Sequence, residues 1–129
     1  MAAALTPEQF AASLLEAAGK ASAQAKAVVK RGANNIKNDA RKNVAQSAPT
    51  HNAHAQYAIT YDEPHLSGSF QWESEVGYDK DIKGGSLGNL LEYGGAGDRS
   101  PAHRDLGRAA DAEEARFGDA LQAMAVKLL

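Results

Sequence analysis

Apolar and small residues recur every three or four positions through the first third of the chain. With about 100° between successive residues, the series falls on one arc of roughly 120° of an α-helix. Its members are Phe10, Leu14, Ala18, Ala21, Ala25, Val28, Val29, Gly32, Ile36 and Ala40. The pattern predicts one long amphipathic helix, with an apolar face along its whole length.

The flanking residues set the ends of this helix. In Thr6-Pro7-Glu8-Gln9 the threonine can cap the helix, proline fits the first turn, and the glutamine can complete a capping box. Ala48-Pro49 disfavours continuation at the other end. The expected helix therefore covers residues 7–46, and Gly19 and Gly32 within it mark a kink or a close helix crossing.

After Pro49 the period changes to two. Tyr57, Ile59 and Tyr61 alternate with other residues, which predicts a strand over residues 55–61. A second alternating run predicts a strand over 69–76: Phe70, Trp72 and Val76 lie on one face, Gln71, Glu73 and Glu75 on the other. We expect an antiparallel pair with one buried and one solvated face, joined through a turn or loop at residues 62–65. A polar loop over residues 77–85 should follow.

A second amphipathic pattern closes the chain. Ser100-Pro101 is a helix-start signal, and the apolar stripe that follows predicts a helix over residues 101–128. The stripe consists of Leu106, Ala110, Phe117, Leu121, Met124 and Leu128. The short segment 86–93 fits a helix or a strand equally well. The expected fold is one α+β domain over residues 1–129: a long N-terminal helix, a small antiparallel sheet, and a C-terminal helix packed on the sheet.

Composition adds a reason to expect self-assembly. The chain has 129 residues, enough for one core, but only 6% are aromatic and much of the apolar content is alanine. Alanine buries little area, so oligomerisation could supply the missing stability. The chain has no cysteine, which excludes disulfides and thiolate metal sites. Its sequence predicts neither a signal peptide nor a membrane span.

Charge is unevenly distributed between the two halves. Residues 1–50 carry seven Lys/Arg and three Asp/Glu, a balance of +4, whereas residues 51–129 carry seven and thirteen, a balance of −6. These sum to the net charge of −2. Opposite charge at the two ends favours stacking against copies of the same chain or against neighbours of opposite sign.

Four cations of the first helix form a basic stripe within roughly 60° of one another. They are Lys26, Lys30, Lys37 and Arg41. Such a stripe can face phosphates, the acidic half of a neighbour, or solvent. Because the sequence pI is about 6.1 and no aromatic residue interleaves the stripe, a solvated or subunit-facing role is favoured over a dedicated DNA site.

Catalytic signals are weak. His51, His54 and His65 could suggest a metal hydrolase, but they fall in an expected loop without the rigid support that zinc ligands need. The glycine-rich segments 84–88 and 94–97 lack the spacing of a phosphate loop. No serine stands in a nucleophile elbow. We therefore expect no enzymatic activity, no metal and no cofactor.

The order of short motifs gives a family resemblance. Ala48-Pro49 ends the first helix, Leu91-Glu92-Tyr93-Gly94 follows the strand pair, and Pro101, Leu106 and Ala109 belong to the last helix. Over about residues 10–129 the chain resembles the tail-completion and head–tail joining (neck) proteins of long-tailed bacteriophages, the siphophages. Two departures are Thr50-His51-Asn52-Ala53 in place of the family's Thr-Gly-x-Leu, and residues 101–106 in place of its Pro-aromatic-Leu.

The resemblance implies a non-catalytic virion protein, made in the host cytoplasm. It would form a ring of six copies between the capsid portal or connector and the tail tube. Genomic DNA would pass through the lumen without sequence readout, and the partners would be neighbouring connector, terminator or tail-tube proteins, with no membrane involved. A tail-tube terminator ring is an alternative within this class. A free DNA-binding protein that uses the basic stripe is an alternative of another class.

The candidate site residues are therefore interface residues. We expect Glu92 to fix the segment before the last helix by pairing with a cation and Tyr93 to fix it by packing; a solvated Glu92 and a core Tyr93 fit equally well. Arg99 and Arg104 are expected to pair with an adjacent subunit. The basic stripe is expected to line a lumen or to meet the acidic half of a neighbour.

Overall fold

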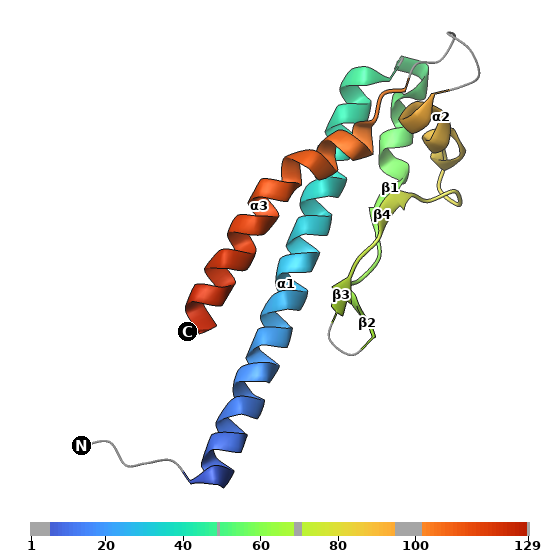
Figure 1. Cartoon of the computed structure of the whole chain (residues 1–129). Helices are drawn as coiled ribbons and strands as arrows, with labels where there is room; N and C mark the ends of the chain where they lie inside the picture. The colour runs from blue at the N-terminus through green and yellow to red at the C-terminus, as the bar shows by residue number, and fades with distance from the viewer. Residues whose placement is uncertain (1–5, 49, 69–70, 95–101, 129) are drawn as a thin grey trace.

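The computed structural model describes residues 6–48, 50–68, 71–94 and 102–128, and its α+β class is the one that the sequence predicts (Figure 1). A long N-terminal helix is followed by short strands, two short helical segments and a C-terminal helix. The elements are α1 (Pro7–Ser47), the 3-10 helix η1 (Thr50–Ala58), β1 (Ile59–Tyr61), β2 (His65–Ser67), β3 (Gln71–Glu73), β4 (Val76–Tyr78), the 3-10 helix η2 (Gly85–Leu87), α2 (Gly88–Tyr93) and α3 (Asp105–Leu128).

Helix α1 agrees with its expected span to within one residue at its C-terminal end. The Thr6 hydroxyl accepts a hydrogen bond from the Gln9 backbone N–H (3.1 Å), and the Gln9 side chain accepts one from the Thr6 N–H (3.0 Å). This capping box satisfies two amide groups that have no partner within the helix. At the other end, Ala48 leaves the helical conformation while its N–H still donates to the Val44 carbonyl.

Helix α3 packs chiefly along α1, and the strands lie on the other side of α1 (Figure 1). A Cβ on Gly32 would lie 3.1 Å from the Phe117 ring, so this glycine marks the close helix crossing expected at one of the two glycines. The expectation that the C-terminal helix packs on the sheet was wrong, because α3 packs on α1 instead. The strands span three residues each and offer no broad face, whereas α1 offers a long apolar stripe.

The four strands form one interrupted antiparallel hairpin, which we call the hairpin. Strands β1 and β4 pair with Tyr61 opposite Val76, and β2 and β3 pair with Leu66 opposite Trp72. The two ladders are separated at Asp62, whose carboxylate accepts hydrogen bonds from the Glu75 N–H (2.6 Å) and the Ser74 hydroxyl (3.1 Å). Side-chain hydrogen bonds of this kind let the chain bend without leaving its amide groups unpaired.

Four expected boundaries in this region were wrong. Residues 55–58 belong to η1 and not to a strand. Of the expected strand 69–76, residues 69 and 70 lie outside the described residues, and the rest breaks after Glu73. Residues 62–64 lie outside helices and strands, as expected of a loop, but His65 begins β2, and the chain reverses between β2 and β3. Part of the expected 77–85 loop is ordered too, since residues 77 and 78 complete β4. Alternation alone could not locate the bend made by Asp62.

The core lies at the end of the molecule remote from the N-terminus. Its buried residues come from α1, η1, β1, α2 and α3, and they are Ala40, Val44, Ala55, Ile59, Leu91 and Ala109. Segment 86–93, left open by its sequence, is helical and forms the end of η2 and all of α2. Gly88 is required there, because a Cβ would collide with the Tyr78 ring.

The last helix starts four residues later than expected, at Asp105. Residues 102–104 are not helical, and the backbone of Arg104 has a φ of 52°. They are tied to α2 by two hydrogen bonds, from the His103 N–H to the Leu91 carbonyl (2.9 Å) and from the Arg104 N–H to the Glu92 carbonyl (3.1 Å). Ser100 and Pro101, the expected start signal, lie outside the described residues. Of the helices described, none is both long and apolar enough for a membrane crossing.

Candidate assembly surface

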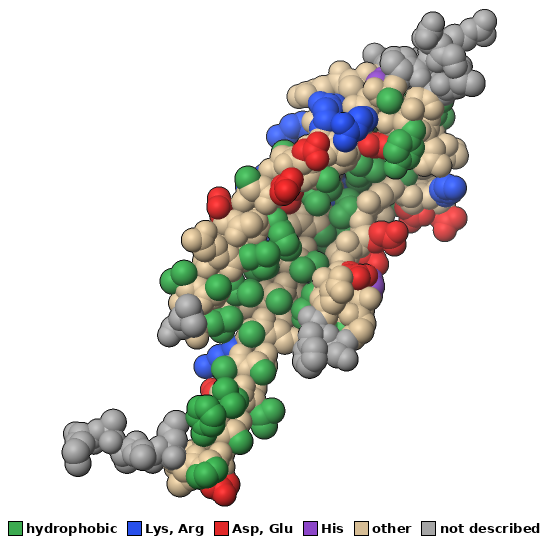
Figure 2. All heavy atoms as spheres, in the orientation of Figure 1, with side chains coloured by type: hydrophobic (Ala, Val, Ile, Leu, Met, Phe, Trp, Pro, Cys, Tyr) green, Lys and Arg blue, Asp and Glu red, His purple; other side chains and the backbone are tan. Residues whose placement is uncertain are grey.

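The first turns of α1 project beyond the rest of the molecule (Figure 1). We call residues 7–20 the arm; every one of them is exposed. Phe10 and Leu14 are each 55% exposed and Leu15 is 76% exposed, which is unusual for large apolar side chains on an amphipathic helix. Figure 2 shows hydrophobic side chains on the projecting part of the molecule. Contiguous exposed apolar surface of this kind is typical of a site of interaction.

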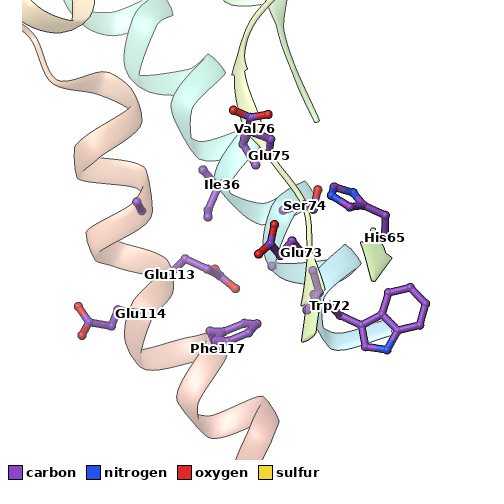
Figure 3. Close-up of a pocket in the computed structure, with 14 residues that line it drawn as sticks. Ile36, His65, Trp72, Glu73, Ser74, Glu75, Val76, Glu113, Glu114 and Phe117 are labelled. Carbon is purple, nitrogen blue, oxygen red and sulfur yellow. The ribbon is translucent and has the colours of Figure 1, made fainter. Parts of the chain in front are cut away.

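A groove of about 660 Å³ lies between α3 and the hairpin, and α1 forms its floor (Figure 3). Val29, Gly32 and Ile36 belong to the floor, Phe117 comes from α3, and Trp72 and Val76 come from the hairpin. The floor and the arm belong to the same arc of α1, so the apolar strip of the arm continues into the groove.

The walls of the groove carry carboxylates. Glu73 from β3 and Glu113 from α3 point toward the space between the two walls (Figure 3). Glu113 is only 4% exposed; Asn35 donates to one of its oxygens (3.0 Å), and the Arg116 guanidinium lies 2.9 Å from the other. The remaining acids that line the groove are Glu75 and Glu114. The groove is thus apolar at its floor and acidic at its sides.

The basic stripe faces the hairpin of its own chain. The Lys26 ammonium lies 5.5 Å from the centre of the Trp72 ring, and that of Lys37 lies 5.3 Å from the centre of the Tyr61 ring. Both are cation–π distances. The stripe therefore helps to hold the hairpin on α1.

The other two cations of the stripe also contact the hairpin. Lys30 forms an ion pair with Glu63 (3.0 Å), and this hydrogen-bonded partner raises the pKa of Lys30. The Arg41 guanidinium donates twice to the Ile59 carbonyl (2.8 and 3.1 Å). Sequence spacing correctly placed the four cations on one face, but their partners lie farther along the chain and could not be identified from spacing.

Glu92 holds the start of α3, as expected, but by a different contact. It is 6% exposed, and its carboxylate accepts hydrogen bonds from the N–H groups of Leu106 (2.7 Å) and Gly107 (3.1 Å). A carboxylate is favoured there because the first turn of a helix presents unpaired N–H groups and a positive dipole end. Tyr93 is 75% exposed, so it does not pack in the core of its own chain. Pairing of Glu92 with a neighbouring cation and packing of Tyr93 at a subunit interface stay predictions.

The two arginines expected at a subunit joint have different outcomes. The Arg104 side chain is exposed and lies 3.9 Å from the Asp111 carboxylate of its own chain, so it remains accessible. Arg99 lies outside the described residues.

A buried polar cluster that the sequence did not reveal joins the end of α1 to the start of α3. Asp105 is fully buried and accepts hydrogen bonds from the Ser47 hydroxyl and the Arg108 guanidinium, both at 2.7 Å. Asn43 donates to the Asp105 carbonyl (3.0 Å). Burial, together with the charges of Asp105 and Glu92, raises the pKa of Tyr78.

Ser47, His103 and Asp105 meet in this cluster without the arrangement of a hydrolytic triad. The Ser47 oxygen lies 3.3 Å from His103 Nδ1, and the Asp105 carboxylate lies 3.9 Å from the same nitrogen. A triad places the nucleophile and the acid at opposite ring nitrogens. The three residues are thus arranged as a structural junction between two helices.

The other histidines are dispersed. His65 is exposed on β2, His54 is half-buried in η1 beside Gly84, and the His51 side chain lies outside what the structure describes. Within the described residues, no group of three or more His, Asp or Glu side chains is placed to hold a metal ion. Comparisons of the chain with models of known families, with curated proteins and with solved structures found no significant match.

Proposed function

We propose that this protein is a structural subunit of the head–tail junction of a long-tailed bacteriophage. In this proposal, copies of the chain assemble into a ring of six that joins the portal or connector to the tail tube and lets the genomic DNA pass. Its location is the virion, and its partners are the neighbouring connector, terminator or tail-tube proteins. The observation that carries the proposal is the exposed apolar arm, a surface suited to contact with another chain.

The segment on which the family resemblance rests has a structural role consistent with the proposal. Leu91 is in the core, Glu92 caps α3, and the Leu91 and Glu92 carbonyls hold residues 103 and 104. The segment thus fixes the position of the last helix against the first. A ring subunit needs such a rigid body, because small errors in subunit shape accumulate around a closed ring.

The charge balances of +4 in residues 1–50 and −6 in the remainder would favour contacts that bring these two segments of different copies together. DNA binding by a free subunit receives less support. The four cations of the stripe already contact the hairpin, which reduces what they can offer to phosphates.

Two measurements test the proposal. Sedimentation velocity and native mass spectrometry should show oligomers that grow with concentration, or assembly when a neighbouring virion ring is added. Imaging of the native particle should place the ring at the junction, and its level separates a neck protein from a tail terminator. A protein that stays monomeric and binds no other virion component contradicts the proposal. Steeply salt-dependent duplex binding by the monomer favours the DNA-binding alternative instead.

A further inference from the structure

We propose that the arm of one copy docks in the groove of the next copy. This inference rests on the proposed self-assembly and specifies the two surfaces that meet. It commits to one occupant of the groove, the N-terminal turns of α1 from a second molecule of this chain.

The arm cannot reach the groove of its own chain. Both belong to a single continuous helix, in which Leu14 and Gly32 are separated by about 27 Å along the axis. The apolar strip of the arm and the groove of one chain are thus held apart and can meet only between molecules. A contact between two different surfaces of identical subunits is heterologous, and it closes into a ring when the rotation between subunits permits.

The groove has room for the apolar ridge of the arm. Its volume of about 660 Å³ falls within the range of about 300–1,000 Å³ of pockets that bury drug-sized ligands, which is enough space for a few large side chains. Phe10 and Leu14 are one helical turn apart and form a ridge, and the alanines at positions 11 and 18 beside them allow close approach. Gly32 and Ala33 have little or no side chain, which leaves space above the floor of the groove between Phe117 and the hairpin.

The contact face of the arm brings no like charge to the acidic groove. Four carboxylates line the groove, so an incoming segment must bring no acid on its contact face. The arc that contains Phe10 and Leu14 carries no charged residue, and Glu16 lies about 160° away from Leu14 around the helix.

Because the chain has no cysteine, single engineered cysteines give an unambiguous test. Leu14→Cys places a thiol on the arm, and Ala110→Cys places one at the groove on an exposed position of α3. The two single-cysteine variants are mixed at high concentration, oxidised and digested, and the linked peptides are quantified by mass spectrometry. Any disulfide between residues 14 and 110 in this mixture joins two different molecules.

Matched controls use the opposite faces of the same helices. Ala12→Cys lies about 160° from Leu14, and Ala112→Cys lies about 160° from Ala110. We expect the 14–110 disulfide to form at least about tenfold more than the 12–110 and 14–112 disulfides, because the bond requires Cβ atoms within roughly 3.5–4.5 Å. Leu14→Asp should raise the concentration needed for assembly by about tenfold or more, whereas Ala12→Asp should not.

Each of the following results would contradict docking of the arm in the groove. Predominant 14–14 disulfides mean that arms pair with each other, and rings without excess 14–110 disulfide mean that another surface builds them. A protein that is monomeric alone but binds another virion component retains the proposed function without this contact. A monomer that binds no virion component removes both.

Discussion

The two halves of α1 share one apolar periodicity but differ in what covers them. From Val28 to Val44 the apolar side is packed by α3 and flanked by the hairpin, and five residues of the helix are buried there. From Pro7 to Lys20 every residue is exposed. Periodicity therefore predicts a helix and the face that it can bury, but the covering elements decide how much of that face is buried.

The lengths of α1 and α3 explain why α3 covers only part of the apolar face of α1. Helix α3 starts beside Ser47 and runs back along α1 for 24 residues, about 36 Å, whereas α1 has 41 residues and is about 62 Å long. The difference of 17 residues leaves the arm uncovered. An isolated helical segment of this length is marginal in water, so the arm depends on its continuity with the packed half of α1.

The largest expected effect comes from placing the same charge in each half. Val44→Asp puts a carboxylate at a fully buried position, and we expect it to lower the free energy of unfolding by about 3–5 kcal/mol. Leu15→Asp should change it by no more than about 0.5 kcal/mol because Leu15 is exposed. Urea unfolding followed by circular dichroism at low protein concentration measures both. Equal stabilities would mean that the two halves do not differ as described.

Removing the cap of α3 should have the next largest effect. Glu92→Ala leaves the N–H groups of Leu106 and Gly107 without their acceptor, at an expected cost of about 1–3 kcal/mol. Glu92→Gln retains one acceptor oxygen and should lose less. Glu114→Ala removes an exposed acid of α3, the helix that Glu92 caps; it is the control and should stay within about 0.5 kcal/mol. Faster amide exchange at the start of α3 should accompany the loss, and unchanged exchange there would argue against the capping role.

How much of the fold and of the candidate site could be predicted from the sequence depends on how far apart along the chain the interacting residues lie. The capping box around Thr6 and the period of α1 are local, and both ends of the helix were predicted closely. The Asp62 bend, the Glu92 cap and the contacts of the basic stripe join residues 12 to 46 positions apart, and single-sequence patterns do not report such pairs. Glu92 was recognised as important from its motif, whereas Asp105, Ser47 and Glu113 carried no local signal.

The two glycines of α1 allow the same substitution to be compared in both halves. A Cβ at Gly19 meets nothing within 4 Å, so Gly19→Ala should stabilise the arm by about 1 kcal/mol and slow its amide exchange about fivefold. At Gly32 the same gain opposes crowding against Phe117, which costs about 1–3 kcal/mol, so a net loss of about 1 kcal/mol is expected. Exchange measured by mass spectrometry and urea unfolding test the pair. Equal gains at both positions would show that α3 does not press on α1 at Gly32.

The smallest expected effect is a loosening of the hairpin in acid. This loosening would leave the middle of α1 less covered, as the arm is. Hydrogen bonds from the Glu75 N–H and the Ser74 hydroxyl lower the pKa of Asp62. A carboxyl group whose pKa is lower in the folded state stabilises that state above its unfolded pKa, near 4, and this contribution is lost as the pH falls through the folded value.

Trp72, the only tryptophan, lies on the hairpin against Lys26, so its fluorescence reports the loosening. We expect Trp72 emission to change below about pH 4 in the wild type and to lose this step in Asp62→Asn, because the amide keeps an acceptor oxygen but cannot titrate. The Asp62 carboxyl resonance should titrate below its usual range in the same samples. An identical acid transition in the two proteins would assign the loosening to a different carboxylate.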